Sequence, residues 1–232
     1  MFEAIIFDVD GVMVDTERLY VQTMRQVARR FGGEVSDETL ARMMGRAPIE
    51  SLRIFVSDLG LAEDPHELMA LRERMMLQSF EQGLDPMPGL MELLAWARPR
   101  LRLAIATGSP RRLLDVILDR LGIADRFQAI QSGDDITRGK PHPEIYQRVL
   151  GQLGLPPEKC VVIEDSGNGV RSGKSAGCHV IAVPNEATRG QDFSAADVVV
   201  PDLGAALAHL RRLMAAADVA SPAAADGGRP HP

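Results

Sequence analysis

The sequence predicts an α/β protein whose core is a doubly wound, Rossmann-like parallel sheet with an inserted helical cap domain. Short apolar runs recur along the 232 residues, and stretches with helical spacing of apolar residues separate them. About 90 residues lie between the first two runs, whereas a crossover between parallel strands needs only a dozen or more. The alternation predicts the parallel sheet, and the long gap predicts the insertion.

Each apolar run is expected to form a strand buried on both faces, because it lacks the alternation of a strand with one face in water. The first run, residues 4–9, ends at Asp10-Gly11, a pair typical of loops. Ligands of open parallel sheets bind at the carboxyl ends of the strands, so the residues after each run are candidate site residues. The remaining runs are residues 101–106, 127–130, 160–163 and 179–183.

The segment after the second run carries the start and stop signals of a helix. Ser109 is a suitable N-cap, Pro110 suits the first helical position, and Gly122 follows the last apolar residue of the pattern. Apolar residues three to four apart lie between them. These signals predict a helix from Pro110 to Leu121.

The segment between the first two runs is helix-like throughout, which predicts a helical cap domain over residues 16–82 and a core domain formed by residues 1–15 and 83–215. Residues 216–232 are rich in Ala, Pro and Gly, and we expect a disordered tail there. The methionines of the insertion are expected in the core of the cap rather than in an adaptable pocket. They are Met43, Met44, Met69, Met75 and Met76; the expected helices are residues 21–31, 36–44, 49–60 and 66–80.

Composition limits the classes of binding partner and the cellular compartment that we expect for this protein. The formal net charge of -6 argues against nucleic acid, because phosphate backbones need a basic stripe. No run of about 18 apolar residues suggests a membrane span. Cys160 and Cys178 adjoin apolar runs, which favours two buried free thiols and a cytoplasmic protein. We expect a monomer or a weak homodimer that acts on a small anionic ligand.

Two aspartates stand directly after the first run. Asp8 and Asp10 are two residues apart, so in an extended chain their side chains point the same way. Two neighbouring carboxylates repel each other unless a cation or a proton compensates, and carboxylate oxygens suit Mg²⁺. The alternative for an isolated pair of this kind is two loop carboxylates that cap a turn.

Three later segments add polar groups at other strand ends. Thr107-Gly108-Ser109 offers hydroxyls and backbone N–H groups for phosphate oxygens, although it could be an ordinary N-cap. Lys140 could balance negative charge as a point cation, or be a solvated surface lysine. Glu164-Asp165 would face the same crevice as Asp8, or cap the following helix.

In this order the segments DVDGV, TGS, GKPHPE and IEDSGNG resemble the four motifs of the haloacid dehalogenase superfamily. The resemblance covers roughly residues 1–215, and the insertion looks like the helical cap of the β-phosphoglucomutase-like subgroup. It implies a Mg²⁺-dependent phosphatase that acts on a small phosphorylated metabolite, such as a sugar phosphate or a nucleotide-like compound.

The resemblance also implies roles for the acidic residues. Asp8 would attack phosphorus and form a phospho-aspartate, which divides one difficult hydrolysis into two easier steps. Asp10 would protonate the leaving alkoxide and then activate water. Mg²⁺ would be held by Asp8, the main-chain carbonyl of Asp10 and Asp165, with Glu164 nearby or acting through water.

The transferring phosphoryl group would be held by Thr107, the amides of Gly108 and Ser109, and Lys140. The cap would supply substrate specificity, and its candidate residues are Glu17 and Arg18, just after the first loop, and Arg46, at a predicted turn. An arginine there could hold the remote anionic or hydroxyl part of a substrate, although a plain surface arginine is the alternative.

Three other functions remain as alternatives: a phosphosugar mutase like β-phosphoglucomutase, a dehalogenase, and a non-catalytic binding module. Dehalogenases of this superfamily lack the second aspartate and need no Mg²⁺, so Asp10 argues against halide chemistry. A module that only binds would not need the whole set of motifs. The mutase carries His, Lys and Arg at cap positions where this chain has Tyr20, Met44 and Pro48.

Overall fold

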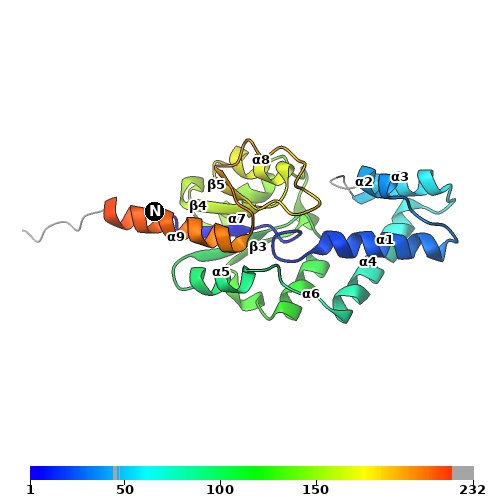
Figure 1. Cartoon of the computed structure of the whole chain (residues 1–232), viewed down its shortest axis with the longest axis horizontal. Coiled ribbons are helices and arrows are strands. Elements are labelled where there is room, and N and C mark those ends of the chain that lie inside the picture. Colours follow the sequence, from blue (N-terminus) through cyan, green and yellow to red (C-terminus); the bar gives the residue numbers. More distant parts are fainter. Residues whose placement is uncertain (44–45, 47, 221–232) are drawn as a thin grey trace, which may run out of the picture.

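A computed structural model describes residues 1–43, 46 and 48–220 of the chain (Figure 1). Its centre is a six-stranded sheet in the order β3-β2-β1-β4-β5-β6, and every recorded strand pair is parallel. The predicted doubly wound parallel sheet is therefore confirmed. The strands are β1 (Ala4–Phe7), β2 (Arg102–Ala106), β3 (Ala129–Gln131), β4 (Cys160–Glu164), β5 (His179–Ala182) and β6 (Val198–Val199).

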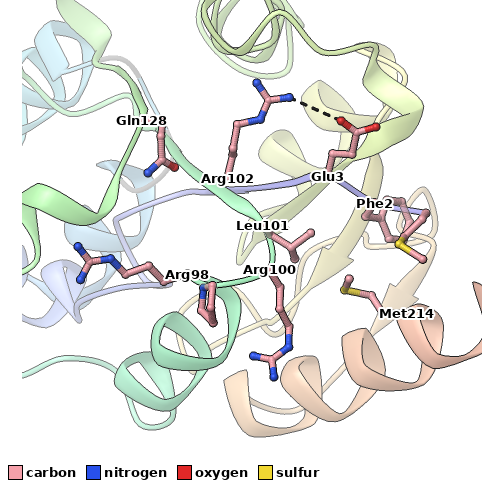
Figure 2. Close-up of a pocket in the computed structure, with 10 residues that line it drawn as sticks. Phe2, Glu3, Arg98, Arg100, Leu101, Arg102, Gln128 and Met214 are labelled. Carbon is pink, nitrogen blue, oxygen red and sulfur yellow. Dashed lines mark ion pairs between the residues drawn. The ribbon is translucent and has the colours of Figure 1, made fainter. Parts of the chain in front are cut away.

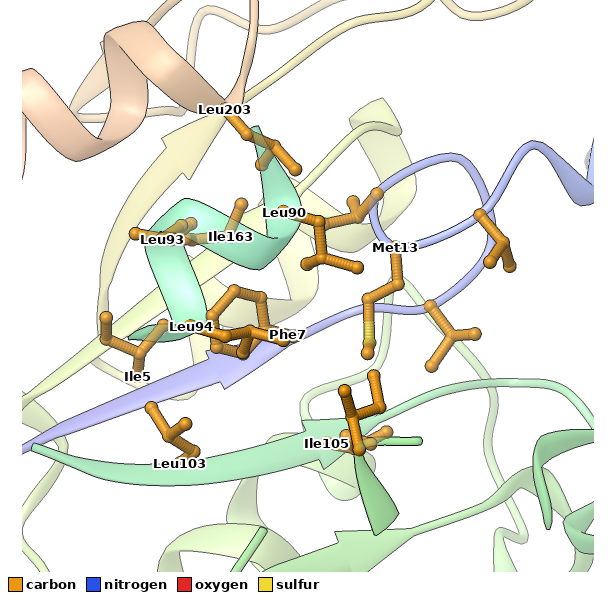
Figure 3. Packing of buried hydrophobic residues seen from close by; sticks show 14 of the residues in the cluster. Ile5, Phe7, Met13, Leu90, Leu93, Leu94, Leu103, Ile105, Ile163 and Leu203 are labelled. Atoms are coloured by element: carbon orange, nitrogen blue, oxygen red, sulfur yellow. The ribbon is translucent and has the colours of Figure 1, made fainter. Parts of the chain in front are cut away.

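Alternate side chains of β1 point to opposite faces of the sheet, and both faces are covered. Ile5 and Phe7 pack on the face that carries α5, α6 and α9, as Figure 3 shows for the leucines of α5. Ala4 and Ile6 pack on the face that carries α7 and α8. Because both faces of the sheet are covered, the strand sequences are continuous apolar runs rather than alternating ones. The covering helices are α5 (Leu90–Ala97), α6 (Arg111–Leu121), α7 (Glu144–Leu153), α8 (Gly167–Ser175) and α9 (Leu203–Ala220), with short 3₁₀ turns at Ala124–Arg126, Gly133–Asp135 and Pro157–Lys159.

Among the described residues, five helices lie between β1 and β2, and the four that precede α5 extend to one side of the sheet in Figure 1. They bury a hydrophobic cluster of their own around Met24, Leu52 and Phe55. The Asp15 side chain caps the first of them by accepting a hydrogen bond from the N–H of Arg18 at 3.1 Å. We call these helices the helical insertion: α1 (Thr16–Arg30), α2 (Asp37–Met43), α3 (Pro48–Leu59) and α4 (Pro65–Gln82).

The insertion confirms most of the methionine prediction. Met43 and Met76 are buried, and Met69 and Met75 are partly buried against the cluster of the insertion. Met44 lies outside the described residues. Met43, Met69 and Met75 therefore pack in the core of the insertion, as predicted, whereas Met76 belongs to the buried cluster that covers β1.

Two helix boundaries differ from the prediction. Helix α6 begins at Arg111 rather than Pro110 and has no side-chain cap, because the Ser109 hydroxyl bonds to Asp10 instead. Helix α9 extends to Ala220, so a disordered tail from residue 216 is wrong for residues 216–220. Their alanine-rich sequence favours the helix. Residues 221–232 lie outside the described part of the chain.

Cys160 and Cys178 are buried free thiols, as predicted. Among the helices that the structure describes, none is both long enough and apolar enough to cross a bilayer.

Candidate active site

The candidate site lies at the carboxyl ends of three adjacent strands. In the sheet, β1 lies between β2 and β4, and Phe7 is in register with Ile105 of β2 and Ile163 of β4. The segments that follow these strands therefore leave the sheet at one level. This register brings together Asp8, Thr107 and Asp165, which are far apart in the sequence.

Three buried carboxylates form the centre of the site. Asp8, Glu164 and Asp165 each offer an oxygen atom within 4.8 Å of the others. The Nζ of Lys140 lies 2.8 Å from Asp8 Oδ1 and 2.6 Å from Glu164 Oε1. One lysine thus faces three carboxylates, and the cluster has more negative than positive charge.

Burial, together with this excess of negative charge, raises the pKa of the aspartates. Burial, with the charges of neighbouring carboxylates, raises the pKa of Asp8 to about 8 and that of Asp165 to about 9. Burial disfavours the charged form of Lys140, but Asp8 and Glu164 hold its pKa well above the usual value. The lysine stays protonated, and the cluster favours one more proton or a cation.

Glu164 has almost all of its hydrogen-bonding capacity occupied. Its Oε1 accepts from Lys140 and from the Tyr146 hydroxyl at 2.8 Å. Its Oε2 accepts from the N–H groups of Asp165 and Ser166 at 3.1 and 3.2 Å, and from the Ser166 hydroxyl at 3.1 Å. A carboxylate has about four lone-pair sites, so these five bonds leave little room for a metal ion at Glu164 itself. Glu164 fixes Lys140 and the loop that carries Asp165.

The other two carboxylates fit a divalent cation better. Asp165 Oδ2 accepts only a neutral donor among the recorded bonds, the side-chain amide of Asn185 at 2.8 Å. The loop after β1 passes close to this pair, since a Cβ at Gly11 would lie 2.3 Å from Asp165 Oδ2 and 2.5 Å from Asn185 Nδ2. Gly11 also has a φ of 74°, which favours glycine. Hard oxygen donors in excess of local positive charge are what Mg²⁺ requires.

Asp10 is oriented by three hydroxyl groups. Its Oδ1 accepts from Thr16 at 2.6 Å, and its Oδ2 accepts from Ser109 at 2.7 Å and Thr107 at 3.1 Å. Thr107 in turn accepts from the N–H of Ser109 at 3.0 Å, which folds the loop around exposed Gly108. The carboxylate of Asp10 is thus held against the segment predicted to hold phosphate.

The three cap candidates are placed differently. Arg18 is exposed and pairs with Asp15 at 3.8 Å. Glu17 lies near Asp10, and its pKa is raised by burial and by the charges of Asp10 and Asp15. Arg46 is exposed, and its Nε donates to the carbonyl of Arg42 at 2.8 Å. Among the described residues, no hydrogen bond or ion pair joins Arg46 to the carboxylates. Its substrate-binding role stays a prediction.

Sequence reasoning missed Thr16, Tyr146 and Asn185. Tyr146 lies on the buried face of α7 and reads as a core residue, although a buried tyrosine hydroxyl needs a partner. Thr16 is the first residue of α1 and Asn185 follows β5. For these two, no local pattern indicates the contact with Asp10 or Asp165.

A separate groove lies away from this site. It has a volume of about 530 Å³ and is lined by residues such as Glu3, Arg100 and Arg102, at the amino ends of β1 and β2 (Figure 2). A second groove of about 280 Å³ lies beside the two chain segments that join the insertion to the core, at Asp15 and residues 83–88. Neither groove is lined by Asp8, Glu164 or Asp165. The candidate site is therefore identified by the chemistry of the side chains at the strand ends.

The chain is similar to known proteins in sequence and in fold. The sequence profile of the haloacid dehalogenase-like hydrolase family matches residues 5–183. The protein CbbY of Rhodobacter capsulatus is 37% identical over 218 residues, which cover 88% of this chain and 95% of that protein. A phosphorylated carbohydrates phosphatase of Thermotoga maritima is 38% identical over 176 residues, which cover 75% of this chain and 82% of that protein. The crystal structure of a CbbY variant from Rhodobacter sphaeroides with xylulose 1,5-bisphosphate has a TM-score of 0.79 at 27% identity, over 88% of this chain and 95% of that one.

Proposed function

The chain belongs to the haloacid dehalogenase-like hydrolases and is a phosphoric monoester hydrolase of that superfamily, and on this basis we propose that it uses Mg²⁺ and a phospho-aspartate on Asp8 to dephosphorylate a small phosphorylated metabolite. The observation that carries the proposal is the buried cluster of Asp8, Glu164 and Asp165, in which Lys140 is the one cation that forms ion pairs among the described residues, beside an Asp10 held by three hydroxyls. A phosphoryl group and a cation would complete this charge arrangement.

Asp8, Asp165 and the main-chain carbonyl of Asp10 would hold the Mg²⁺, and Glu164 would act through water, because its own oxygens are engaged. Bound there, Mg²⁺ would neutralise charge on the phosphoryl oxygens and lower the cost of two ionised aspartates side by side. Lys140 would donate hydrogen bonds to the Asp8 oxygen that does not attack phosphorus and to one phosphoryl oxygen.

The reaction would run in two displacements. A carboxylate oxygen of Asp8 forms a bond to phosphorus while the ester bond to the leaving oxygen breaks, and Asp10 gives that oxygen its proton. Asp10, now ionised, takes a proton from water, whose oxygen attacks phosphorus and releases phosphate from Asp8. Thr107, Gly108 and Ser109 would position the phosphoryl group in both steps.

The substrate would be a sugar phosphate or a compound of similar size. This follows from the relative that hydrolyses phosphorylated carbohydrates, and from the position of the helical insertion beside the site. The insertion would act as a cap that excludes water and contacts the rest of the substrate, with Glu17 and Arg46 as candidate contacts.

A direct test measures inorganic phosphate released from p-nitrophenyl phosphate and a panel of sugar phosphates, with Mg²⁺ and with EDTA. We expect Mg²⁺-dependent release by the wild type and none by Asp8→Asn. Phosphate release by Asp8→Asn at the wild-type rate would contradict the proposal. With β-glucose 1-phosphate we expect free phosphate and no accumulation of glucose 6-phosphate, whereas fast isomerisation would point to a mutase.

A further inference from the structure

The loop after β5 leaves the sheet beside Asp165. Ala182 of β5 is in register with Glu164 of β4, and the N–H of Val183 donates to the carbonyl of Glu164 at 2.7 Å. Since the two strands are adjacent and parallel, the segments that follow them start at the same edge of the sheet. We call residues 184–192 the β5 loop, and this loop bonds at two points to the segment that carries Asp165.

One residue of the β5 loop contacts a carboxylate that the proposed function assigns to Mg²⁺. The side-chain Nδ2 of Asn185 donates to Asp165 Oδ2 at 2.8 Å, and in the described part of the chain no other side chain bonds to that carboxylate. An amide is a neutral donor. It can therefore fix the direction of the carboxylate without adding a positive charge that would repel a cation.

The orientation of the Asn185 amide is determined by its other hydrogen bonds. Its Oδ1 accepts from the N–H of Ala187 at 2.9 Å, and from the N–H and the hydroxyl of Thr188 at 3.1 and 3.2 Å. A flipped amide would place its own N–H groups against two backbone N–H groups, so the oxygen faces Thr188 and the nitrogen faces Asp165. Thr188 is buried, which keeps these bonds away from water.

Neighbouring contacts restrict the pair of Asn185 and Asp165 from two sides. Gln191 of the β5 loop accepts a hydrogen bond from the N–H of Gly167 at 2.8 Å, so the loop holds the segment after β4 at a second point. The turn after β1 approaches from the other side, where a Cβ at Gly11 would overlap both side chains. The amide and the carboxylate are therefore enclosed between the turn after β1 and the β5 loop.

We propose that Asn185 is a positioning residue of the metal site: its amide, fixed by Thr188, holds the Asp165 carboxylate in the orientation that binds Mg²⁺. The inference rests on the proposed function and adds to it a residue beyond the family profile, whose match ends at residue 183. Removal of a group that orients a metal-binding side chain typically weakens metal binding by about 10–100-fold. The role of Asn185 should therefore be visible in metal affinity itself, before any substrate is bound.

The test measures Mn²⁺ binding to the protein without substrate, by electron paramagnetic resonance of the free ion during a titration. Mn²⁺ accepts the same oxygen ligands as Mg²⁺. We expect Asn185→Ala to raise the Kd of Mn²⁺ about 10-fold or more above the wild-type value. Asn168→Ala is the matched control: Asn168 is the other asparagine of the chain, its side chain bonds to Arg171, and the Kd should not change.

A second pair of variants tests the lock on the amide without touching Asn185. Thr188→Val removes the hydroxyl that bonds to Asn185 and should raise the Kd of Mn²⁺ in the same direction. Thr188→Ser keeps the hydroxyl and should bind Mn²⁺ as the wild type does. This pair keeps the inference testable even where Asn185→Ala fails to fold.

Activity should show the same dependence on the metal. In assays with p-nitrophenyl phosphate, we expect the loss of rate in Asn185→Ala to become smaller as the Mg²⁺ concentration is raised, because the variant is deficient in metal binding. A loss that is equal at every Mg²⁺ concentration would overturn the inference, since it would place the effect of Asn185 in the chemical step.

Two further results would overturn the inference and leave the phosphatase intact. One is an Asn185→Ala variant that binds Mn²⁺ as tightly as Asn168→Ala does, even if its urea midpoint in EDTA is lower, because Asn185 would then only stabilise the loop. The other is an equal Kd in Thr188→Val and Thr188→Ser. A wild type that neither binds Mn²⁺ nor hydrolyses p-nitrophenyl phosphate with Mg²⁺ would instead refute the proposed function itself.

Discussion

Single hydroxyl groups decide how the catalytic carboxylates are held. Glu164 is completely buried, and Tyr146 supplies one of the donors that make this burial tolerable. Asp10, which is only partly buried, depends on Thr16, Thr107 and Ser109 for its direction. Each hydroxyl can be removed with little change in side-chain shape, which makes its contribution measurable.

Tyr146→Phe should lower the free energy of unfolding by about 1.5–3 kcal/mol, since it removes one hydrogen bond to a buried charged group. Urea unfolding followed by circular dichroism measures this change. The aromatic ring and its contact with Lys140 remain in the variant, so a lower urea midpoint would report the hydroxyl alone. An unchanged midpoint would show that the bond to Glu164 contributes nothing.

Thr16→Val should lower kcat about 10-fold and change KM much less, because Thr16 positions Asp10 and does not bind the substrate in this account. Thr16→Ser keeps the hydroxyl and should restore most of kcat. Steady-state kinetics of both variants against p-nitrophenyl phosphate provides the measurement. Equal loss in the Val and Ser variants would mean that the methyl group of Thr16, through packing, is the important part.

The turn after β1 is tightly constrained, because Gly11 has a positive φ and a Cβ added to it would clash with Asp165 and Asn185. Gly11→Ala should therefore displace Asp165 and abolish Mg²⁺-dependent activity. Gly60→Ala is a matched control: Gly60 has a φ of 63° and nothing within 4 Å of an added Cβ. We expect the control to lose about 1–2 kcal/mol of stability from the left-handed backbone alone and to keep its activity. Full activity of Gly11→Ala would refute the packing described for this turn.

The helices and strands show how far the sequence could predict this molecule. The five longer strands and the insertion follow from apolar runs and helical spacing, which are local signals. Strand β6 has two residues, too few to form such a run. Ser109 has the sequence of an N-cap, but it bonds to Asp10, a residue 99 positions away. Such contacts depend on which strands are adjacent in the sheet, and no short segment encodes that order.

The site residues also divide into those that local sequence signals indicate and those that depend on contacts between distant segments. Asp8, Asp10, Thr107, Lys140 and Asp165 stand at predicted strand ends, and the structure brings them together. Tyr146 and Asn185 contact the site from separate elements, and each has an unremarkable neighbourhood in the sequence.

In the molecule as a whole, the raised pKa values of Asp8 and Asp165 predict how stability depends on pH and Mg²⁺. Both aspartates titrate near pH 4 when unfolded, about 3.9, but at about 8 and about 9 in the folded, metal-free protein. Between these limits the folded state binds more protons than the unfolded state, so the free energy of unfolding falls as pH rises. Mg²⁺ would replace these protons and remove the penalty.

We therefore expect the urea midpoint in EDTA to decrease between about pH 6 and about pH 8.5, and Mg²⁺ to raise it more at the higher pH. Asp165→Asn should weaken both effects, because one of the two titrating groups is gone. A Mg²⁺ effect that is equal at both pH values, or larger at the lower one, would contradict the proposed charge balance of the cluster.

The central claim, a covalent phosphoryl group on Asp8, can be tested by mass spectrometry of the Asp10→Asn variant. Without its general base, this variant should form the phospho-aspartate from p-nitrophenyl phosphate, whose leaving group needs little protonation, and hydrolyse it slowly. With Mg²⁺ we expect the intact protein to gain the mass of one phosphoryl group, located by digestion to the peptide that contains Asp8. The double variant Asp8→Asn, Asp10→Asn should gain none. A phosphoryl group on another residue, or no adduct in a variant that still releases p-nitrophenol, would contradict the account.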